Sequence, residues 1–103
     1  MGISVRVLDC TLRDGGYVNG WEFSHVQISK ITKSLNQSNV DIIELGYLND
    51  KKGMNVNSTL FDSLKSVDVA IGELDLTAQL VVMIDLFAFD VDKLPHKSKT
   101  RVD

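Results

Sequence analysis

A charged, glycine-rich stretch near the start of the chain contains the residue types that could do chemistry. Arg13 and Asp14 lie side by side, and Gly15 and Gly16 follow them directly. A carboxylate beside a guanidinium can meet an oxygen-bound metal or an anionic substrate, and paired glycines let the backbone turn and leave open space above Asp14. The alternative is a βα turn in which Arg13 and Asp14 form an exposed salt bridge worth about 0 to 1 kcal/mol.

The residues around this stretch follow the pattern of a strand, a loop and a helix. Alternating apolar residues over 3–8 predict a strand that ends at the charged stretch. The glycines and the asparagine within residues 15–21 predict a loop rather than the start of a helix. Ser24 is a good N-cap, and apolar residues then recur at helical spacing. We therefore expect a helix over 24–37 whose apolar stripe packs on a sheet.

A second strand and a second helix are expected next. Residues 40–48 are largely β-branched or apolar and are bounded by turn-forming residues, which predicts a strand. Residues 49–57 are polar and predict an exposed loop. Ser58 is expected to cap a helix with apolar positions at Leu60, Phe61, Leu64 and Val67. Residues 68–77 have no clear period and are expected to be irregular.

The last predicted strand is the most apolar run of the chain. Residues 80–84 predict a fully buried strand that ends at Asp85. A helical turn is expected over 90–93, and Pro95 stops it. The predicted order is β-α-β-α-β, which gives an α/β fold with parallel strands. Three parallel strands alone leave two open sheet edges and a half-covered face.

The composition narrows the class of protein. A chain of 103 residues with 44% hydrophobic and 24% charged residues is typical of one globular domain with a modest core. The net charge is -3, and the one basic run, at residues 96–101, is expected to be a solvated loop, so nucleic-acid binding is disfavoured. A single cysteine, no signal peptide and no apolar run of about 18 residues favour a cytoplasmic protein that is not embedded in a membrane.

Two motifs resemble those of a known family. The string Asp9-Cys10-Thr11-Leu12-Arg13-Asp14-Gly15-Gly16-Tyr17 resembles the first-strand signature D-x-T-x-R-D-G of the metal-dependent aldolase and lyase superfamily, which has the TIM-barrel fold. Its members include 4-hydroxy-2-oxovalerate aldolase, hydroxymethylglutaryl-CoA lyase, isopropylmalate synthase and homocitrate synthase. The run Ile43-Glu44-Leu45-Gly46 resembles the second-strand motif I-E-x-G, one βα unit later. The resemblance implies that residues 1–103 are the N-terminal β-α-β-α-β part of a TIM barrel, which typically needs about 250 residues.

The resemblance also implies roles for single residues, because catalytic groups of such barrels come from the carboxyl ends of the strands. Asp14 corresponds to a ligand of a divalent metal, Mn²⁺ or Mg²⁺. Arg13 corresponds to the residue that holds the substrate and its developing enolate, and Glu44 supports the site from the second strand. Gly15 and Gly16 would lie beside the substrate. Cleavage of a carbon-carbon bond next to a ketone leaves an enolate, which a hard cation and a forked cationic donor both stabilise.

Two features depart from the family pattern. The family's other metal ligands are two histidines in an H-x-H motif on a late strand, and the histidines here are His25 and His96, which form no such pair. The aldolase branch has a catalytic histidine at the position of Tyr17. A tyrosine has a pKa near 10, so at neutral pH it is a poorer general base and a better hydrogen-bond donor. The metal site is therefore at best half present, and the aldol substrate stays open.

Several of these residues also have a purely structural interpretation. Glu44 would pair with Arg13 or cap a helix, since ion-pair networks are often structural. Asp85 is expected to cap the turn after it. The other expectations concern single residues: Asp9 as a hydrogen-bonding anchor, Cys10 as a small buried residue, Trp21 and Phe23 as a lid or as a staple on the following helix, and His25 and His96 at the surface.

The sequence thus predicts a metal-dependent, aldolase-like lyase that cleaves or forms a carbon-carbon bond in a 2-oxo acid, with Arg13, Tyr17 and Glu44 as catalytic residues. Residues 1–103 alone are expected to be inactive. One alternative is an acyl-CoA-dependent Claisen-type synthase, which shares the Arg-Asp pair. Another is a non-catalytic barrel module that associates through its open edges. Self-association, or packing against the remainder of a barrel, is expected in each case because of those edges.

Overall fold

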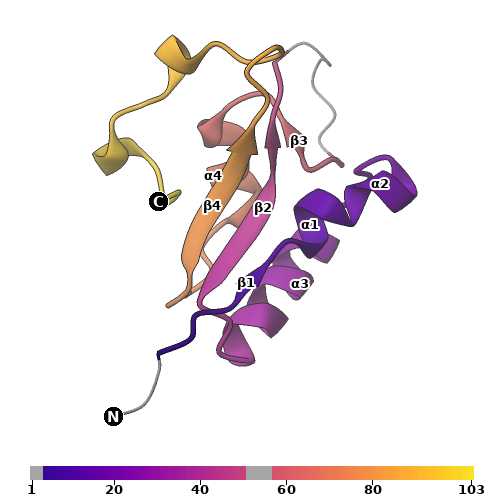
Figure 1. The fold of residues 1–103 in the computed structure, drawn as a ribbon, viewed down its shortest axis with the longest axis vertical. Coiled ribbons are helices and arrows are strands. Elements are labelled where there is room, and N and C mark those ends of the chain that lie inside the picture. Colours follow the sequence, from indigo (N-terminus) through magenta and orange to yellow (C-terminus); the bar gives the residue numbers. More distant parts are fainter. Residues whose placement is uncertain (1–3, 51–56) are drawn as a thin grey trace.

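The fold is organised around strand β2 (Ile42–Leu48), which pairs in parallel with each of the other strands (Figure 1). The computed structural model describes residues 4–50 and 57–103. β4 (Gln79–Ile84) runs along one edge of β2, so β1 (Leu8–Asp9) and β3 (Leu60–Phe61) share the other edge. The helices are α1 (Thr11–Asp14), α2 (Gly16–Asn19), α3 (His25–Gln37) and α4 (Leu64–Ile71), followed by the short 3-10 helices η1 (Val91–Lys93) and η2 (Lys97–Lys99). The predicted α/β class with a parallel sheet is confirmed.

Helix α3 confirms the helix predicted over 24–37. Its N-cap, Ser24, accepts a hydrogen bond from the backbone N–H of Gln27 at 3.2 Å. The Gln27 side chain accepts one from the Ser24 N–H at 2.8 Å, which completes a capping box. Ile28 and Thr32, one turn apart, are fully buried on the side that faces the sheet.

The prediction for the second helix is wrong at both of its ends. Ser58 does not cap a helix; it is buried, and the residues after it form strand β3. The cap of α4 is Ser63, whose hydroxyl accepts a hydrogen bond from the N–H of Ser66. The helix then continues to Ile71, inside the segment predicted to be irregular, and Gly72 ends it with a positive φ of 57°.

The start of the chain also differs from the prediction. Of the strand expected over 3–8, residues 4–7 are exposed and outside any strand, and pairing with β2 begins at Leu8; residue 3 lies outside the described part. Residues 15–21 were expected to be a loop but contain α2, directly after α1. Asp9 accepts a hydrogen bond from the Thr11 N–H at 2.8 Å, so the chain turns into α1 directly after β1.

The remaining elements match more closely. β2 begins two residues later than predicted, β4 begins one residue earlier, and η1 confirms the expected helical turn before Pro95. The prediction that 80–84 is fully buried is wrong, since Leu80 is 3% exposed but Met83 is 41% exposed. The predicted loop over 49–57 falls mostly outside the described residues.

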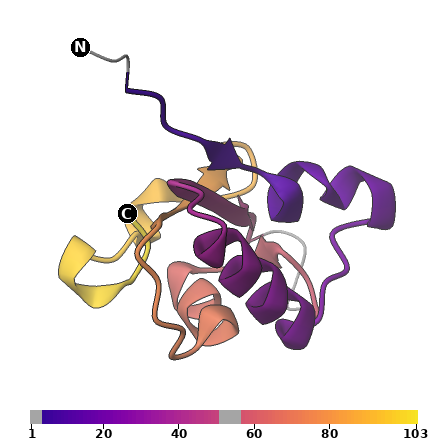
Figure 2. The ribbon, with the colours of Figure 1, turned by 90° about the horizontal axis from the view of Figure 1, so that it is seen from below.

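The core lies between the sheet and the two long helices. Figure 2 shows α3 and α4 on the same face of the sheet. Strand residues Ile43 and Leu45 and helix residues Ile28 and Val67 are fully buried there. Partners in a ladder point to the same side of a sheet, so Leu8 and Ile42, Glu44 and Val81, and Tyr47 and Met83 share the opposite face. That face is only partly covered, because Leu8 and Met83 are exposed.

The edge of β4 is less open than the sequence predicts. The backbone N–H of Asp103 donates to the carbonyl of Leu80 at 2.7 Å, and the Asp103 carboxylate accepts from the Leu80 N–H at 3.0 Å. Just before it, Val102 is buried. The basic run at 96–101 is mostly exposed, as predicted, although Arg101 is half-buried and donates to the carbonyl of Gly72 at 2.7 Å.

Candidate functional site

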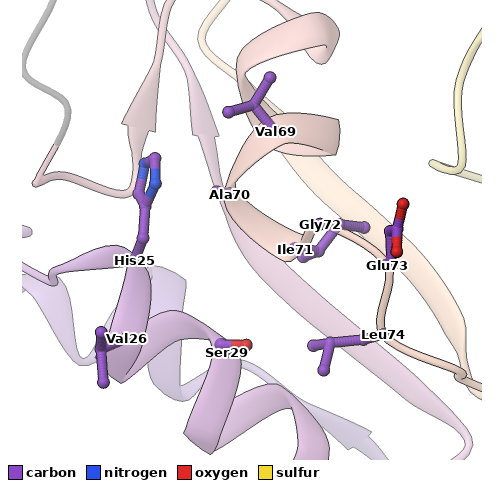
Figure 3. Close-up of a pocket in the computed structure, with 9 residues that line it drawn as sticks. All are labelled: His25, Val26, Ser29, Val69, Ala70, Ile71, Gly72, Glu73 and Leu74. Atoms are coloured by element: carbon purple, nitrogen blue, oxygen red, sulfur yellow. The ribbon is translucent and has the colours of Figure 1, made fainter.

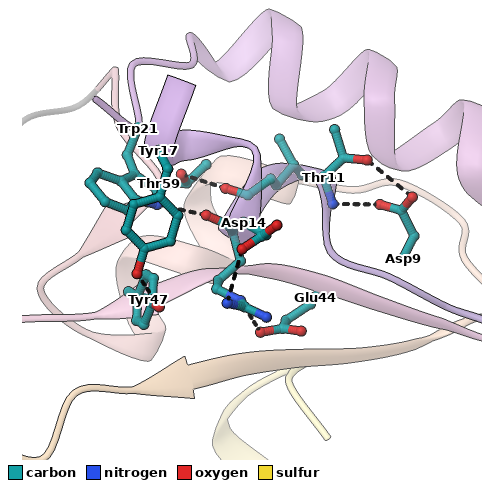
Figure 4. Close-up of polar contacts among 10 residues, drawn as sticks. Asp9, Thr11, Asp14, Tyr17, Trp21, Glu44, Tyr47 and Thr59 are labelled. Carbon is teal, nitrogen blue, oxygen red and sulfur yellow. Dashed lines mark hydrogen bonds and ion pairs between the residues drawn. The ribbon is translucent and has the colours of Figure 1, made fainter. Parts of the chain in front are cut away.

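The ion pair between Arg13 and Glu44 is the centre of the candidate site (Figure 4). Arg13 comes from α1 and Glu44 from the middle of β2, and the Arg13 Nε atom lies 2.6 Å from Glu44 Oε1. The side chains are 19% and 7% exposed. The sequence therefore places these two charges together correctly, and the structural interpretation that Glu44 pairs with Arg13 is confirmed.

Two more groups surround the guanidinium of Arg13. The Asp14 carboxylate lies 3.6 Å from its Nη1 atom, and the ring of Tyr47 lies below its Cζ atom at 5.7 Å. The hydrogen bond to Glu44 raises the pKa of Arg13 above its usual range, and Tyr47 adds to this while desolvation opposes it. Arg13 is therefore a permanent cation held in place by β2.

Glu44 and Tyr47 both face Arg13 because strand β2 is irregular between them. Alternation would send residues 44 and 47 to opposite faces of the sheet. The register with β4 shifts between these two residues, and Gly46 in between has a φ of 155°. A Cβ at Gly46 would lie 2.1 Å from the carbonyl oxygen of Thr59 on the neighbouring segment. The glycine of the I-E-x-G run thus permits the irregularity and the close approach of residue 59.

Three aromatic side chains form a cluster beside the ion pair. Tyr17 and Trp21 pack edge to face with ring centres 4.6 Å apart, and Trp21 and Tyr47 do so at 6.0 Å. The hydroxyls of Tyr17 and Tyr47 lie 3.2 Å apart, within hydrogen-bonding distance. This hydrogen bond is the main cause that raises the pKa of Tyr17. Tyr17 is therefore a neutral hydrogen-bonding group at neutral pH.

The expected open space at the paired glycines is filled by their neighbours. A Cβ at Gly16 would lie 1.9 Å from Cδ1 of Trp21, and a Cβ at Gly15 would lie 2.2 Å from the Thr11 carbonyl oxygen. The indole N–H of Trp21 donates to the carbonyl of Arg13 at 2.7 Å. Trp21 thus packs on the backbone that presents Arg13, and the glycines make that contact possible.

Thr59 connects the separate parts of the site, although no motif points to it. It is fully buried, and its hydroxyl donates to the Leu12 carbonyl at 2.8 Å. Its N–H donates to the carbonyl of Trp21 at 3.0 Å, and its carbonyl accepts from the Tyr47 N–H at 2.9 Å. The β-branched and apolar run Thr59-Leu60-Phe61, followed by the helix cap Ser63, is the sequence pattern that could have indicated a short strand here.

The other single-residue expectations have clear outcomes. Asp9 is an anchor as predicted, because its carboxylate accepts from both the N–H and the hydroxyl of Thr11. Asp85 caps its turn by accepting from the Phe87 N–H at 3.1 Å. Three further residues lie as follows: Cys10 is half-buried rather than buried, and His25 and His96 are at the surface.

A cavity of about 490 Å³ lies at the carboxyl ends of β2 and β4, next to the aromatic cluster. The aromatic rings of Tyr17, Trp21 and Tyr47 line one part of it. Asp85 and Phe87, from the turn after β4, line another part. Tyr47 therefore borders both this cavity and the guanidinium of Arg13.

A second hollow lies between α3 and the end of α4, on the helical side of the molecule (Figure 3). His25 and Ser29 stand one turn apart on α3, and Glu73 stands on the opposite wall. These are residue types of a nucleophilic triad, but Figure 3 shows the three side chains separate from one another around the hollow. We therefore keep the residues around Arg13 and Glu44 as the candidate site.

The described residues do not form a complete metal site. Asp14, the expected ligand, has a 63% exposed side chain and lies against Arg13. No group of three or more His, Cys, Asp or Glu side chains that could hold a metal ion occurs within residues 4–50 and 57–103. Mg²⁺ takes six oxygen ligands in octahedral geometry, several of which are usually waters, so a single carboxylate is only one part of such a site.

Comparisons with other proteins leave the site to be judged on its own geometry. Models of protein families, curated proteins and solved structures were each compared with the chain, and no match was found. Among the helices of the described ranges, none is both long enough and apolar enough to cross a bilayer.

Proposed function

We propose that the chain is the N-terminal part of an aldolase-like TIM barrel that cleaves or forms a carbon-carbon bond in a 2-oxo acid. The observation that supports this proposal is the fixed guanidinium of Arg13. Arg13 follows the carboxyl end of β1, and β2 holds its guanidinium through Glu44, on the Nε side, and through the ring of Tyr47 near the carboxyl end of β2. Catalytic groups of TIM barrels come from this end of the strands.

The chemistry of the proposed reaction suits Arg13 more than any other described residue. Bond cleavage beside a ketone puts negative charge on the oxo oxygen, and a nearby fixed cation stabilises that charge without having to reorganise. Glu44 occupies the Nε side of the guanidinium, so the Nη side is the one that would meet a carboxylate and an oxo oxygen. The exposed Asp14 would have to turn away for this contact.

Tyr17 and Tyr47 would act as hydrogen-bond donors in this reaction. The raised pKa of Tyr17 keeps its proton in place at neutral pH. The pair of hydroxyls stands beside Arg13, where a donor can hold the oxygen of a substrate hydroxyl or carbonyl. This role differs from that of the histidine base in the family that the sequence resembles.

The proposal includes a divalent metal, Mn²⁺ or Mg²⁺, and among the described residues only Asp14 is proposed as its ligand. Asp14 is exposed and its carboxylate oxygens are hard ligands, so it would supply one position of such a metal. The other ligands would come from outside the described residues. A bound metal would supply further stabilisation of the enolate charge.

One experiment tests the proposed function directly. The longest natural form of the protein is assayed for metal-dependent release of pyruvate from 4-hydroxy-2-oxo acids. Arg13→Lys should lower turnover because a point charge does not replace the planar fork. Arg6→Lys, an exposed arginine of the chain start, is the matched control and should not change turnover. Equal turnover in the wild type and in Arg13→Lys would contradict the role of Arg13.

A non-catalytic module that associates through the sheet is the second candidate, and the partly covered sheet face favours it. Leu8 and Met83 are exposed on that face, and the nearby Val5 and Val7 are exposed as well. Exposed apolar patches of this kind mark interaction sites. We expect the 103-residue chain to self-associate in light scattering. A cooperatively melting monomer at micromolar concentration would contradict this expectation.

A further inference from the structure

The cavity at the ends of β2 and β4 is largely lined by apolar and aromatic side chains. Besides the aromatic cluster, the aliphatic residues Leu60, Ile84 and Leu86 and the ring of Phe87 line it. Leu86 is 72% exposed and Phe87 is 99% exposed. Large apolar side chains that are exposed together around a concave site are typical of a surface that buries an apolar partner.

The cavity and the ion pair share one wall. The ring of Tyr47 contacts the Arg13 guanidinium and also lines the cavity, and its hydroxyl meets that of Tyr17, another lining residue. A ligand whose anionic end lies at Arg13 would therefore direct its other end toward the apolar lining. Asp85 also lines the cavity and would repel a second anionic group there.

We propose that this cavity receives the distal part of the 2-oxo acid, and that this part is a bulky apolar group, with an aromatic ring as the preferred form. The inference rests on the proposed function for its anionic end. The volume of about 490 Å³ lies within the range of about 300 to 1,000 Å³ that holds organic ligands, and is more than a short alkyl chain needs. Aromatic side chains favour a ring in edge-to-face or offset contact.

The chain offers a direct probe of this cavity, because Trp21 is its only tryptophan and lines the cavity. Tryptophan fluorescence of the 103-residue protein is titrated with 2-oxo-4-phenylbutanoate and with 2-oxobutanoate, which lacks only the phenyl ring. We expect the phenyl compound to bind about ten-fold more tightly or better, because burial of a ring removes apolar area from water. Equal affinity for the two compounds would overturn the proposal.

Two exposed positions supply the matched variants. Phe87→Ala removes a lining ring at a site that is 99% exposed, so folding should not depend on it. Val18→Ala changes a residue that is 92% exposed and does not line the cavity. We expect Phe87→Ala to weaken the phenyl compound several-fold and Val18→Ala to leave its affinity unchanged. An unchanged affinity in Phe87→Ala would place the ring elsewhere and overturn the proposal.

Failure of the inference and failure of the proposed function give different results. If both oxo acids bind equally and Arg13→Lys weakens both, Arg13 meets the oxo acid and the apolar subsite is wrong. If 3-phenylpropanol, which has no acid group, binds as tightly as 2-oxo-4-phenylbutanoate and Arg13→Lys changes neither, the proposed function is wrong. In that case the 2-oxo acid part of the inference falls with it.

Discussion

The two faces of the sheet differ in what strand β2 presents to them. The face under α3 and α4 receives Ile43 and Leu45, which are fully buried against aliphatic neighbours. The opposite face receives Glu44 and Tyr47, which hold Arg13 beside half-exposed apolar residues. One seven-residue strand thus supports a core on one side and a polar site on the other. The buried core therefore lies on one side of β2 and the polar site on the other, where the register shift between Glu44 and Tyr47 brings both residues to the same face.

The largest expected effect tests whether stability comes from the helix-covered face. Leu45→Ala should lower the free energy of unfolding by about 2 to 5 kcal/mol, because it leaves a cavity among buried side chains. Met83→Ala on the opposite face should cost less than about 1 kcal/mol, since Met83 is 41% exposed. Urea denaturation followed by circular dichroism measures both. Similar losses in the two variants would mean that the opposite face is covered in solution.

The next prediction compares how much Glu44 and Asp14, the two carboxylates near Arg13, contribute to stability. Glu44→Gln should cost about 2 to 3 kcal/mol in urea denaturation, because Arg13, whose side chain is 19% exposed, loses its closest charged partner and keeps only the longer contact with Asp14. Asp14→Asn is the matched control and should cost less than about 1 kcal/mol, since its side chain is 63% exposed. A loss for Asp14→Asn as large as that for Glu44→Gln would reverse the ranking of the two ion pairs.

A smaller effect tests whether the glycine at position 16 is needed by the aromatic cluster. Gly16→Ala places a Cβ 1.9 Å from Trp21, so the indole must move, at a cost of about 1 kcal/mol. Gly72→Ala, with a φ of 57° and open space around it, should cost about as much through backbone strain. Only Gly16→Ala should change the emission of Trp21. An unchanged emission spectrum in that variant would contradict the observed contact.

The sequence predicted the elements that local chemistry determines. The capping box at Ser24 and the apolar spacing after it were enough for α3, and β-branched runs were enough for β2 and β4. Strand β3 could not be predicted because it forms only where Gly46 lets residue 59 approach β2. Ser58 resembled a helix cap because a serine before an apolar run is compatible with either a helix or a strand.

The site was predictable to a similar degree. Arg13, Asp14 and Glu44 were singled out from their motifs, and the structure places them together. Tyr47 and Trp21 were missed as partners of Arg13. Alternation along β2 would have turned Tyr47 away from Glu44, and only the shift in register brings both to one side. Contacts that depend on an irregularity of this kind arise from tertiary packing rather than from local pattern.

The smallest effect concerns the pH at which the tyrosine pair comes apart. The hydrogen bond to Tyr47 raises the folded-state pKa of Tyr17 above the usual value near 10. A raised folded-state pKa means that this stabilising contribution is fully present below pH 10 and is lost as the pH rises through the folded-state pKa.

Spectrophotometric titration should therefore show one tyrosine that ionises later than free tyrosine. Tyr47→Phe should lower the pKa of Tyr17 toward its ordinary value, because the largest cause of the shift is gone, while Val18→Ala should leave the delay unchanged. If Tyr17 ionised at its ordinary pH in the wild type, the two hydroxyls would not be bonded in solution, and the open face of the sheet would lose one of the contacts that order it.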